Sequence, residues 1–216
     1  LGSAGAEPGS PPRTYRVAPI VARPGRTRAE VRQTLGAPDG VPLAAVYLNP
    51  HFKDPSIAAA VEEGLARAGF RVHAVGEGYR TRPGWVGTDA HFADVVHAAE
   101  LFVSGAGMGA LELARSSGTP LLVLLGDQPE QARNVAELLQ RAPDFALREV
   151  LVGDPELARS IAVAATALVS RGTPAGRPSS TAAEAPWVEA FLDLVRAARV
   201  VTSGRRALVA HPRPAF

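Results

Sequence analysis

Short apolar runs alternate with amphipathic stretches from Leu43 onward, and this alternation restricts the possible folds more than any other feature of the sequence. Apolar runs of about four to eight residues have the length of strands that are buried on both faces. Strands that alternate with helices form parallel sheets with crossover helices. The sequence therefore predicts an α/β fold with a doubly wound, Rossmann-like parallel sheet, with strands at residues 43–48, 70–75, 100–104, 120–125 and 149–152, the fourth of them central.

Capping residues mark the ends of the predicted helices. Asp54 and Pro55 form an N-cap followed by proline at the first helical position, and Asp154 with Pro155 repeats this pattern. Gly118 supplies a C-cap for a helix that begins near Met108. With the apolar spacing, these signals predict helices at residues 55–68, 108–117, 127–139 and 155–170, a further helix around residues 92–96, and a loop at residues 76–89.

The two ends of the chain differ from this body in composition. Residues 1–14 have no periodicity, so we expect a disordered N-terminal segment. Residues 15–170 form the predicted domain, residues 171–186 form a linker rich in Pro, Gly, Ser and Thr, and residues 187–216 carry a C-terminal helix and a basic tail. The only methionine is Met108, so we expect a fragment or a processed form of a longer chain.

Composition and spacing exclude several classes of protein. The chain has no cysteine, which excludes disulfides, thiolate metal sites and a cysteine nucleophile. No apolar run approaches the roughly 18 residues that cross a bilayer, and no signal peptide is visible, so we expect a cytoplasmic protein. The five histidines lack the spacing of metal ligands, and Ser104 lacks a GxSxG context, so neither a metal site nor a serine hydrolase is predicted.

Charge is distributed unevenly along a chain whose net charge is only +2. No acid follows Asp193, whereas five arginines do. Such a basic end allows peripheral contact with phosphate, a partner or the inner face of a membrane, although a solvated helix end is the simpler interpretation. Within the body, arginines are interspersed with acids such as Glu62 and Asp94, which argues against nucleic acid as a partner.

A glycine-rich stretch follows the third predicted strand, where residues 102–112 read FVSGAGMGALE. A strand that runs through glycines into a helix brings backbone amides and the positive end of a helix dipole to one point, and such a point binds phosphate. In an α/β sheet this turn lies at the carboxyl edge, where ligands bind. A tight turn with close helix packing is the structural alternative, because a single glycine-rich turn is a weak motif.

One functional interpretation of this stretch is dinucleotide binding. Gly105, Gly107 and Ala110 match the GxGxxG/A fingerprint. Asp127 follows about 20 residues later, where an acid would hold a ribose. Against this interpretation, the fingerprint normally opens the first unit of its domain, whereas two strand and helix units precede it here.

The second interpretation is a nucleotide-sugar site, and it uses more of the residues. Glu112 lies about one turn into the helix, where a carboxylate accepts hydrogen bonds from sugar hydroxyls. Gln131 and Asn134 share one face of the next predicted helix, where amides can contact a second sugar. Both interpretations place the ligand at the same edge of the sheet.

Four segments carry a resemblance to a known family: residues 99–107, Glu112-Leu113, residues 118–120, and Gln131 with Asn134. They are similar to the strand with its glycine-rich turn, the ribose glutamate, the GxP sequence and the QxxN helix of nucleotide-sugar glycosyltransferases with the GT-B fold. From about Ala18 to Ser170 the chain resembles their C-terminal, donor-binding domain, especially that of the peptidoglycan N-acetylglucosaminyl transferase type. The resemblance implies half of a GT-B fold and hexosyl transfer from a UDP-sugar, which is the substrate, with no cofactor.

By this resemblance, Glu112 holds the ribose of a uridine nucleotide, the glycine-rich amides hold the diphosphate, and Trp85 with Val86 forms a platform for the base. Trp85 as a cover of the sheet edge is the alternative. No catalytic residue is identified. The implied donor-binding residues are Gly105, Ala106, Gly107, Met108, Gly109, Glu112, Glu130, Gln131, Asn134, Trp85 and Val86.

The chain also departs from the family pattern. The loop after the first strand reads NPHFK at residues 49–53, where the family usually has a Gly-Gly-Ser phosphate contact, and Lys53 or His51 supplies charge there instead. Glu112 follows Gly107 by one residue less than in many members. A GT-B enzyme also needs an N-terminal domain for its acceptor, which is unknown here. Nothing upstream of Tyr15 can form that domain, so we expect half of an enzyme that works with a missing domain or partner half.

Three rival functions stay open at this stage. A nucleotide-sugar epimerase or hydrolase of the same fold would share the donor site and differ on the acceptor side. A degenerate donor domain would only bind a ligand or a partner, as the altered first loop suggests. An NAD-binding Rossmann domain would use the same glycine-rich turn.

Overall fold

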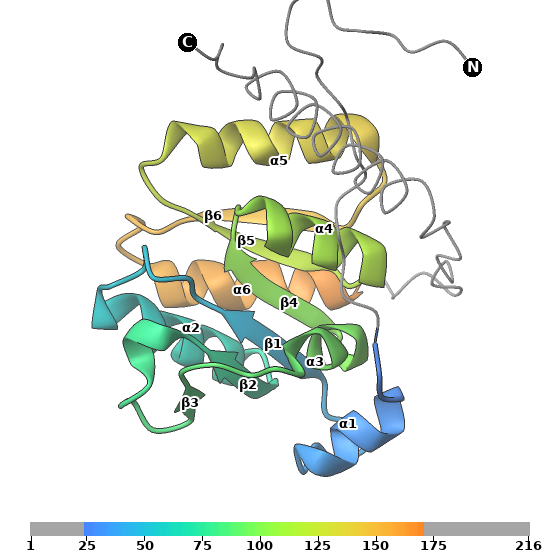
Figure 1. Cartoon of the computed structure of the whole chain (residues 1–216). Coiled ribbons are helices and arrows are strands. Elements are labelled where there is room, and N and C mark those ends of the chain that lie inside the picture. The colour runs from blue at the N-terminus through green and yellow to red at the C-terminus, as the bar shows by residue number, and fades with distance from the viewer. Residues whose placement is uncertain (1–23, 171–216) are drawn as a thin grey trace, which may run out of the picture. The chain divides into compact units, whose positions relative to one another are not determined.

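The computed structural model describes residues 24–170, which form a three-layered α/β arrangement around one parallel sheet (Figure 1). The predicted N-terminal segment, linker, C-terminal helix and basic tail lie outside the described residues. The sheet has the order β3-β2-β1-β4-β5-β6. Its strands are β1 (Leu43–Tyr47), β2 (Arg71–Val75), β3 (Trp85–Val86), β4 (Leu101–Gly105), β5 (Leu121–Leu125) and β6 (Leu147–Leu151).

Helices cover both faces of the sheet. The apolar core on one face includes residues of α2 and α6, and the core on the other face includes residues of α1, α3, α4 and α5. This arrangement confirms the predicted doubly wound, Rossmann-like fold. The helices are α1 (Arg28–Thr34), α2 (Pro55–Arg67), α3 (Phe92–Ala98), α4 (Met108–Ser117), α5 (Pro129–Arg141) and α6 (Leu157–Ser170), with a 3₁₀ turn η1 (Glu77–Tyr79).

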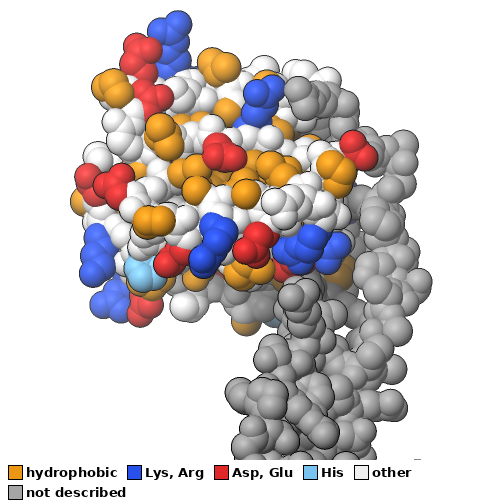
Figure 2. All heavy atoms as spheres, turned by 90° about the horizontal axis from the view of Figure 1, so that it is seen from above, with side chains coloured by type: hydrophobic (Ala, Val, Ile, Leu, Met, Phe, Trp, Pro, Cys, Tyr) orange, Lys and Arg blue, Asp and Glu red, His pale blue; other side chains and the backbone are white. Residues whose placement is uncertain are grey.

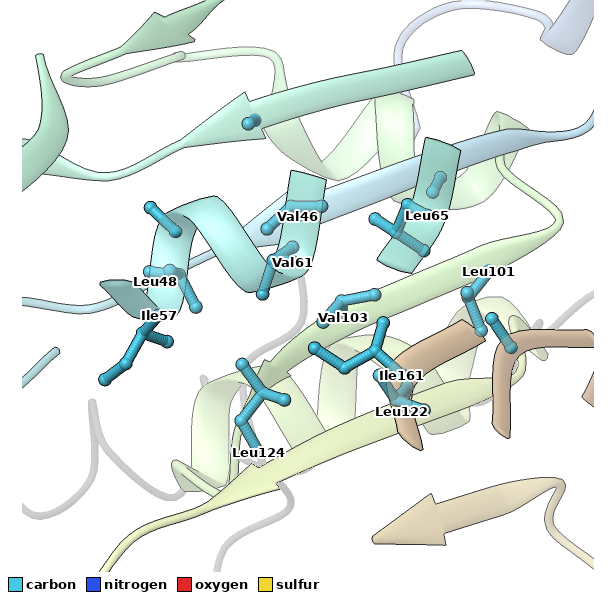
Figure 3. Close-up of a cluster of buried hydrophobic side chains, with 14 of the residues drawn as sticks. Val46, Leu48, Ile57, Val61, Leu65, Leu101, Val103, Leu122, Leu124 and Ile161 are labelled. Atoms are coloured by element: carbon cyan, nitrogen blue, oxygen red, sulfur yellow. The ribbon is translucent and has the colours of Figure 1, made fainter. Parts of the chain in front are cut away.

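One apolar core lies between the sheet and the two helices α2 and α6, and the predicted apolar runs contribute to it as strands. Val46, Val103 and Leu122 lie on three neighbouring strands and face Val61 and Ile161 of the two helices (Figure 3). All of these side chains are buried. Burial of a full aliphatic side chain stabilises a fold by roughly 1.5–3 kcal/mol, so α2 and α6 hold this face of the sheet along its central strands.

Local capping signals placed several boundaries correctly. α4 spans the predicted residues 108–117, and Gly118 ends it in the left-handed region with φ +64°. Asp54 caps α2, where its side chain accepts a 2.8 Å hydrogen bond from the Ser56 amide. Asp154 accepts from the Glu156 amide, but α6 begins only at Leu157, two residues later than predicted.

Other elements differ from the prediction. β3 and η1 occupy the predicted loop at 76–89, and β6 begins at Leu147 instead of residue 149. The fourth predicted strand, β5, is buried on both faces as expected, but β1 and β4 are the central pair. α1 was not predicted, although Thr27 and Glu30 form a capping box that marks its start.

Candidate functional site

The strand order reverses between β1 and β4, and this reversal defines the candidate site. From β1 the chain crosses to β2 on one side, whereas β4 and β5 follow on the other. In open α/β sheets, ligands bind at this switch point, beyond the carboxyl ends of the strands. Tyr47 of β1 pairs in register with Ser104 of β4, and the Ser104 hydroxyl donates a 2.9 Å hydrogen bond to the Tyr47 carbonyl. The two strands are therefore fixed to each other where the ligand would bind.

The β4–α4 turn presents an uncapped helix N-terminus at this point. Gly107 is the N-cap of α4, and no side chain caps the helix. The first amides of a helix have no partner within it, so those that follow Gly107 are available to an anion. A Cβ placed on Gly107 or Gly109 would meet nothing within 4 Å, and Met108 is exposed. The predicted phosphate-binding amides thus border open space.

Gly105 has a different role from the other glycines of the turn. A Cβ at this position would lie 2.7 Å from Cε2 of Phe52, so only glycine fits beneath that ring. Phe52 is buried and comes from the loop between β1 and α2. The contact packs the two turns at the switch point against each other, and it is the close packing that the structural alternative predicted for this one glycine.

The predicted side chains of α5 brace the neighbouring turns. The Asn134 amide donates a 3.0 Å hydrogen bond to the carbonyl of Ala106, which is buried. Gln131 accepts from the Gly126 amide and donates to the Gln128 side chain. Glu130 is exposed in the first turn of the helix. The structure thus brings these residues to the site, with Asn134 and Gln131 engaged by the protein, and their contact with a donor sugar stays a prediction.

Glu112 is engaged by two arginines. Its side chain is only 2% exposed, and its Oε2 accepts a 2.7 Å hydrogen bond from Arg115 Nε. Its Oε1 lies 2.9 Å from Arg141 Nη1 in the last turn of α5, at ion-pair distance but without hydrogen-bond geometry. The carboxylate therefore links α4 to the end of α5 that is remote from the glycine-rich turn. The ribose role implied by the resemblance stays a prediction, and it requires Glu112 to exchange these partners.

Trp85 is a buried residue of β3. Its side chain is 6% exposed, its indole nitrogen donates to Glu62 of α2, and its ring centroid lies 4.9 Å from that of Tyr79. Arg82 donates two 2.7 Å hydrogen bonds to Glu62, which hold the pKa of this carboxyl below its usual value. The indole is buried at the sheet edge, and Val86, which is 41% exposed, is the part of the pair that faces outward. The role of Trp85 and Val86 as a platform for the base stays a prediction.

A pocket that the sequence did not indicate lies beside the switch point. Its cavity measures about 220 Å³ and is bordered by the carboxyl ends of β1, β2 and β3. Two aromatic rings and two carboxylates are among its lining groups, and their residues are spread over positions 47–92, so the pattern is hard to find in the sequence. Its lining residues are Tyr47, Pro50, Val75, Glu77, Gly87, Thr88, Asp89 and Phe92.

A larger groove, of about 890 Å³, lies along β6 and α6. It includes the exposed Leu151 and Val163 but no residue of β1 or β4. Figure 2 shows the molecule from the side of α5, with hydrophobic side chains gathered in the middle of the surface and charged side chains of both signs around them. Because the groove along β6 and α6 contains no residue of β1 or β4, the candidate site is assigned to the β1–β4 region.

Residues 24–170 contain no group of three or more potential metal ligands. Among these residues, no helix combines the length and the apolar character needed to cross a bilayer.

Comparisons with known proteins find structural similarity only. No model of a protein family matches the chain, and no curated protein matches it. The glycotransferase of kitacinnamycin is 20% identical with a TM-score of 0.45, over 61% of this chain and 36% of that one. Arabidopsis thaliana UGT89C1 complexed with quercetin is 16% identical with a TM-score of 0.47, over 67% and 39%. LpCGTa in complex with UDP is 20% identical with a TM-score of 0.47, over 72% and 41%.

The chain therefore spans about two fifths of the length of these solved structures. The likeness concerns the fold, which for residues 24–170 is the six-stranded parallel sheet with helices on both faces. The peptidoglycan transferase type predicted from the sequence is not among the proteins named, and it stays a prediction.

Proposed function

We propose that this chain binds the nucleoside-diphosphate sugar donor of a glycosyltransferase, with the diphosphate at the N-terminus of α4. The single observation that carries the proposal is the uncapped helix N-terminus that follows the glycine-rich turn at the switch point. Amides held rigidly at this position stabilise the charge that develops on a leaving diphosphate, which is electrostatic catalysis without a metal. An N-terminal domain or partner half would bring the acceptor.

The chemistry around the turn supports a diphosphate in particular. Two open positions on either side of Met108, Gly107 and Gly109, let a ligand approach the backbone closely. Lys53 and His51 are exposed in the β1–α2 loop, which Phe52 docks against the turn, so the Lys53 ammonium and the hydrogen-bonding imidazole of His51 are available near the same point. A sugar-binding amide or carboxylate can come from α5, whose first turn carries the exposed Glu130.

The strand order also suits a dinucleotide, but the turns do not. In the dinucleotide fold the fingerprint follows β1. Here β1 leads into Asn49, Pro50 and His51, and α2 is already capped by the Asp54 carboxylate. The Asp54 carboxylate in this turn would repel a pyrophosphate, so the nucleotide-sugar interpretation is the stronger of the two.

Calorimetric titration with UDP, UDP-N-acetylglucosamine and NAD tests the proposal. We expect the uridine compounds to bind with saturation and NAD to give no signal. Gly107→Asp places a carboxylate at the N-cap of α4, and like charges brought together cost several kcal/mol, so UDP affinity falls on the order of 100-fold. Gly153→Asp is the matched control, because it adds the same charge in open space before α6. Equal UDP affinity in both variants, or binding of NAD alone, would contradict the proposal.

A further inference from the structure

The pocket beside the switch point combines two kinds of wall. Tyr47 and Phe92 supply aromatic rings whose centroids lie 5.9 Å apart, and Pro50 and Val75 extend the apolar surface. Glu77 and Asp89 add carboxylates. Ligand pockets are typically apolar with a few well-placed polar groups that fix orientation. This composition suits a ring with one apolar C–H face and several hydroxyl groups.

Asp89 is held in place by the protein and still has free hydrogen-bonding capacity. One of its oxygens lies 2.9 Å from His73 Nε2, and the other accepts a 2.8 Å hydrogen bond from the His91 amide. An ionised carboxylate offers about four lone-pair sites, so roughly two remain for a ligand. His73 is itself packed against Phe92, with ring centroids 6.3 Å apart. The carboxylate is therefore oriented before any ligand arrives, which favours binding.

Size and position limit the ligand further. The cavity of about 220 Å³ is smaller than the roughly 300–1,000 Å³ of pockets for drug-sized molecules, so it admits one ring and not a whole nucleotide. Tyr47 of this pocket is the register partner of Ser104, just before the glycine-rich turn. Neighbouring strands lie about 4.8 Å apart, so a ring in the pocket and a phosphate at α4 are within the span of one nucleotide sugar.

We propose that this pocket binds a sugar ring through vicinal hydroxyl groups, with Asp89 as their acceptor and His73 as the residue that positions Asp89. The assignment moves hydroxyl recognition away from Glu112, which two arginines occupy in this structure. It rests on the proposed function, because the ring belongs either to the ribose or to the transferred sugar of the same donor. Both sources share the vicinal diol.

Titration of the full chain with UDP and 2′-deoxy-UDP tests this assignment. A hydrogen bond between a hydroxyl and a charged carboxylate contributes substantially to the binding free energy. The wild type should therefore bind UDP about tenfold more tightly than 2′-deoxy-UDP. Asp89→Asn should weaken UDP binding about tenfold and abolish the preference. Asp144→Asn, which removes an exposed carboxylate between α5 and β6, is the matched control and should change neither. Melting temperatures confirm that each variant is folded.

UDP-N-acetylglucosamine identifies the source of the ring. If the ribose occupies the pocket, Asp89→Asn removes the preference for UDP over 2′-deoxy-UDP. If the transferred sugar occupies it, Asp89→Asn removes the affinity difference between UDP-N-acetylglucosamine and UDP instead. Either result supports the assignment. Glu77→Gln, at an exposed position, offers a second variant that leaves the core intact, with a smaller expected loss of about threefold.

His73 is tested by rescue. His73→Gln retains a side-chain donor for Asp89 and should bind the nucleotides with wild-type affinities. His73→Leu should fold, and its nucleotide affinities should fall toward those of Asp89→Asn. The assignment is overturned if folded Asp89→Asn binds all three nucleotides as the wild type does. A wild type that binds no uridine nucleotide defeats the proposed function, and this assignment with it. A wild type that binds UDP, with no change in any of the three affinities in folded Asp89→Asn, defeats the assignment alone.

Discussion

The two turns at the switch point occupy equivalent places in the topology and end in helix N-termini of opposite character. After β1, Asp54 caps α2 with its own carboxylate, and Pro55 at the first helical position removes an amide. After β4, Gly107 leaves α4 without a side-chain cap. Topology alone therefore does not make an anion site. Only the turn whose helix dipole and amides are left unsatisfied by the protein is available to a ligand.

The two turns also differ in what they contribute to each other. The β1–α2 loop supplies the bulky Phe52, and the β4–α4 turn supplies the space, because Gly105 has no side chain. The β1–α2 loop, whose helix is capped, therefore packs against the β4–α4 turn and supports it. Asn134 holds the same turn from α5 through the Ala106 carbonyl. A turn with free amides is kept rigid by neighbours that do not use those amides.

Phe52→Ala should break this support and have the largest effect on stability. Removal of a buried phenylalanine typically lowers the free energy of unfolding by about 3–5 kcal/mol. Urea denaturation measures this loss, and Phe52→Leu, which retains part of the apolar volume, should lose less. UDP affinity should also fall in Phe52→Ala, because the amides of the neighbouring turn become less well ordered. Unchanged UDP affinity in the folded variant would show that the β4–α4 turn needs no support.

Gly105→Ala tests the same contact from the other side. The new Cβ would lie 2.7 Å from the Phe52 ring, so the variant should lose about 1–3 kcal/mol through overpacking. Because the clash is with one ring, the loss should shrink in a Phe52→Leu background, and a double-mutant cycle in urea measures this coupling. If the losses of unfolding free energy in Gly105→Ala and Phe52→Leu were additive, the strain would not arise from the contact between the two turns.

The Asp54 cap of α2 makes stability depend on pH, whereas the uncapped α4 has no such group. The hydrogen bond from the Ser56 amide lowers the pKa of Asp54 in the folded protein. A lowered folded pKa adds stability above the unfolded value of about 3.9, and this stability is lost as pH falls through the folded value. The melting-temperature advantage over Asp54→Ala should therefore be constant near neutral pH and shrink below about pH 4. Asp54→Asn keeps a capping oxygen without a titrating group and should show no such change with pH.

Much of this fold follows from local sequence. Asp54, Pro55 and Gly118 act within one helical turn of their own positions, so the boundaries they mark were predictable. The glycine-rich turn was found for the same reason, since its residues are contiguous. β3 has only two residues, Trp85 and Val86, and carries too little pattern to be recognised.

The parts of the site that escaped prediction depend on contacts between distant residues. Gly105 looked like a phosphate-binding glycine, but its constraint comes from Phe52, which lies 53 positions earlier. The ribose role of Glu112 stays a prediction, but its contact with Arg141 of the following helix could not be foreseen from the sequence. Asp89 and Tyr47 were not selected because only the sheet register brings their strands and loops together around one pocket.

Gly107→Asp gives the smallest expected change in stability, and its sign is the informative part. The backbone of Gly107 has φ −71° and ψ 141°, values that any residue adopts, and a Cβ there meets nothing within 4 Å. Aspartate at an N-cap improves on glycine by a few tenths of a kcal/mol, so the melting temperature should rise slightly while UDP affinity falls.

That combination separates the two explanations of the glycine-rich turn. If packing required glycine at this position, Gly107→Asp would destabilise the protein, as Gly105→Ala is expected to do. A variant that is at least as stable as the wild type but no longer binds UDP shows that the protein forgoes an available cap. The N-terminus of α4 is then left uncapped at a cost in stability, whereas Asp54 caps that of α2. Ligand binding at α4 explains this difference.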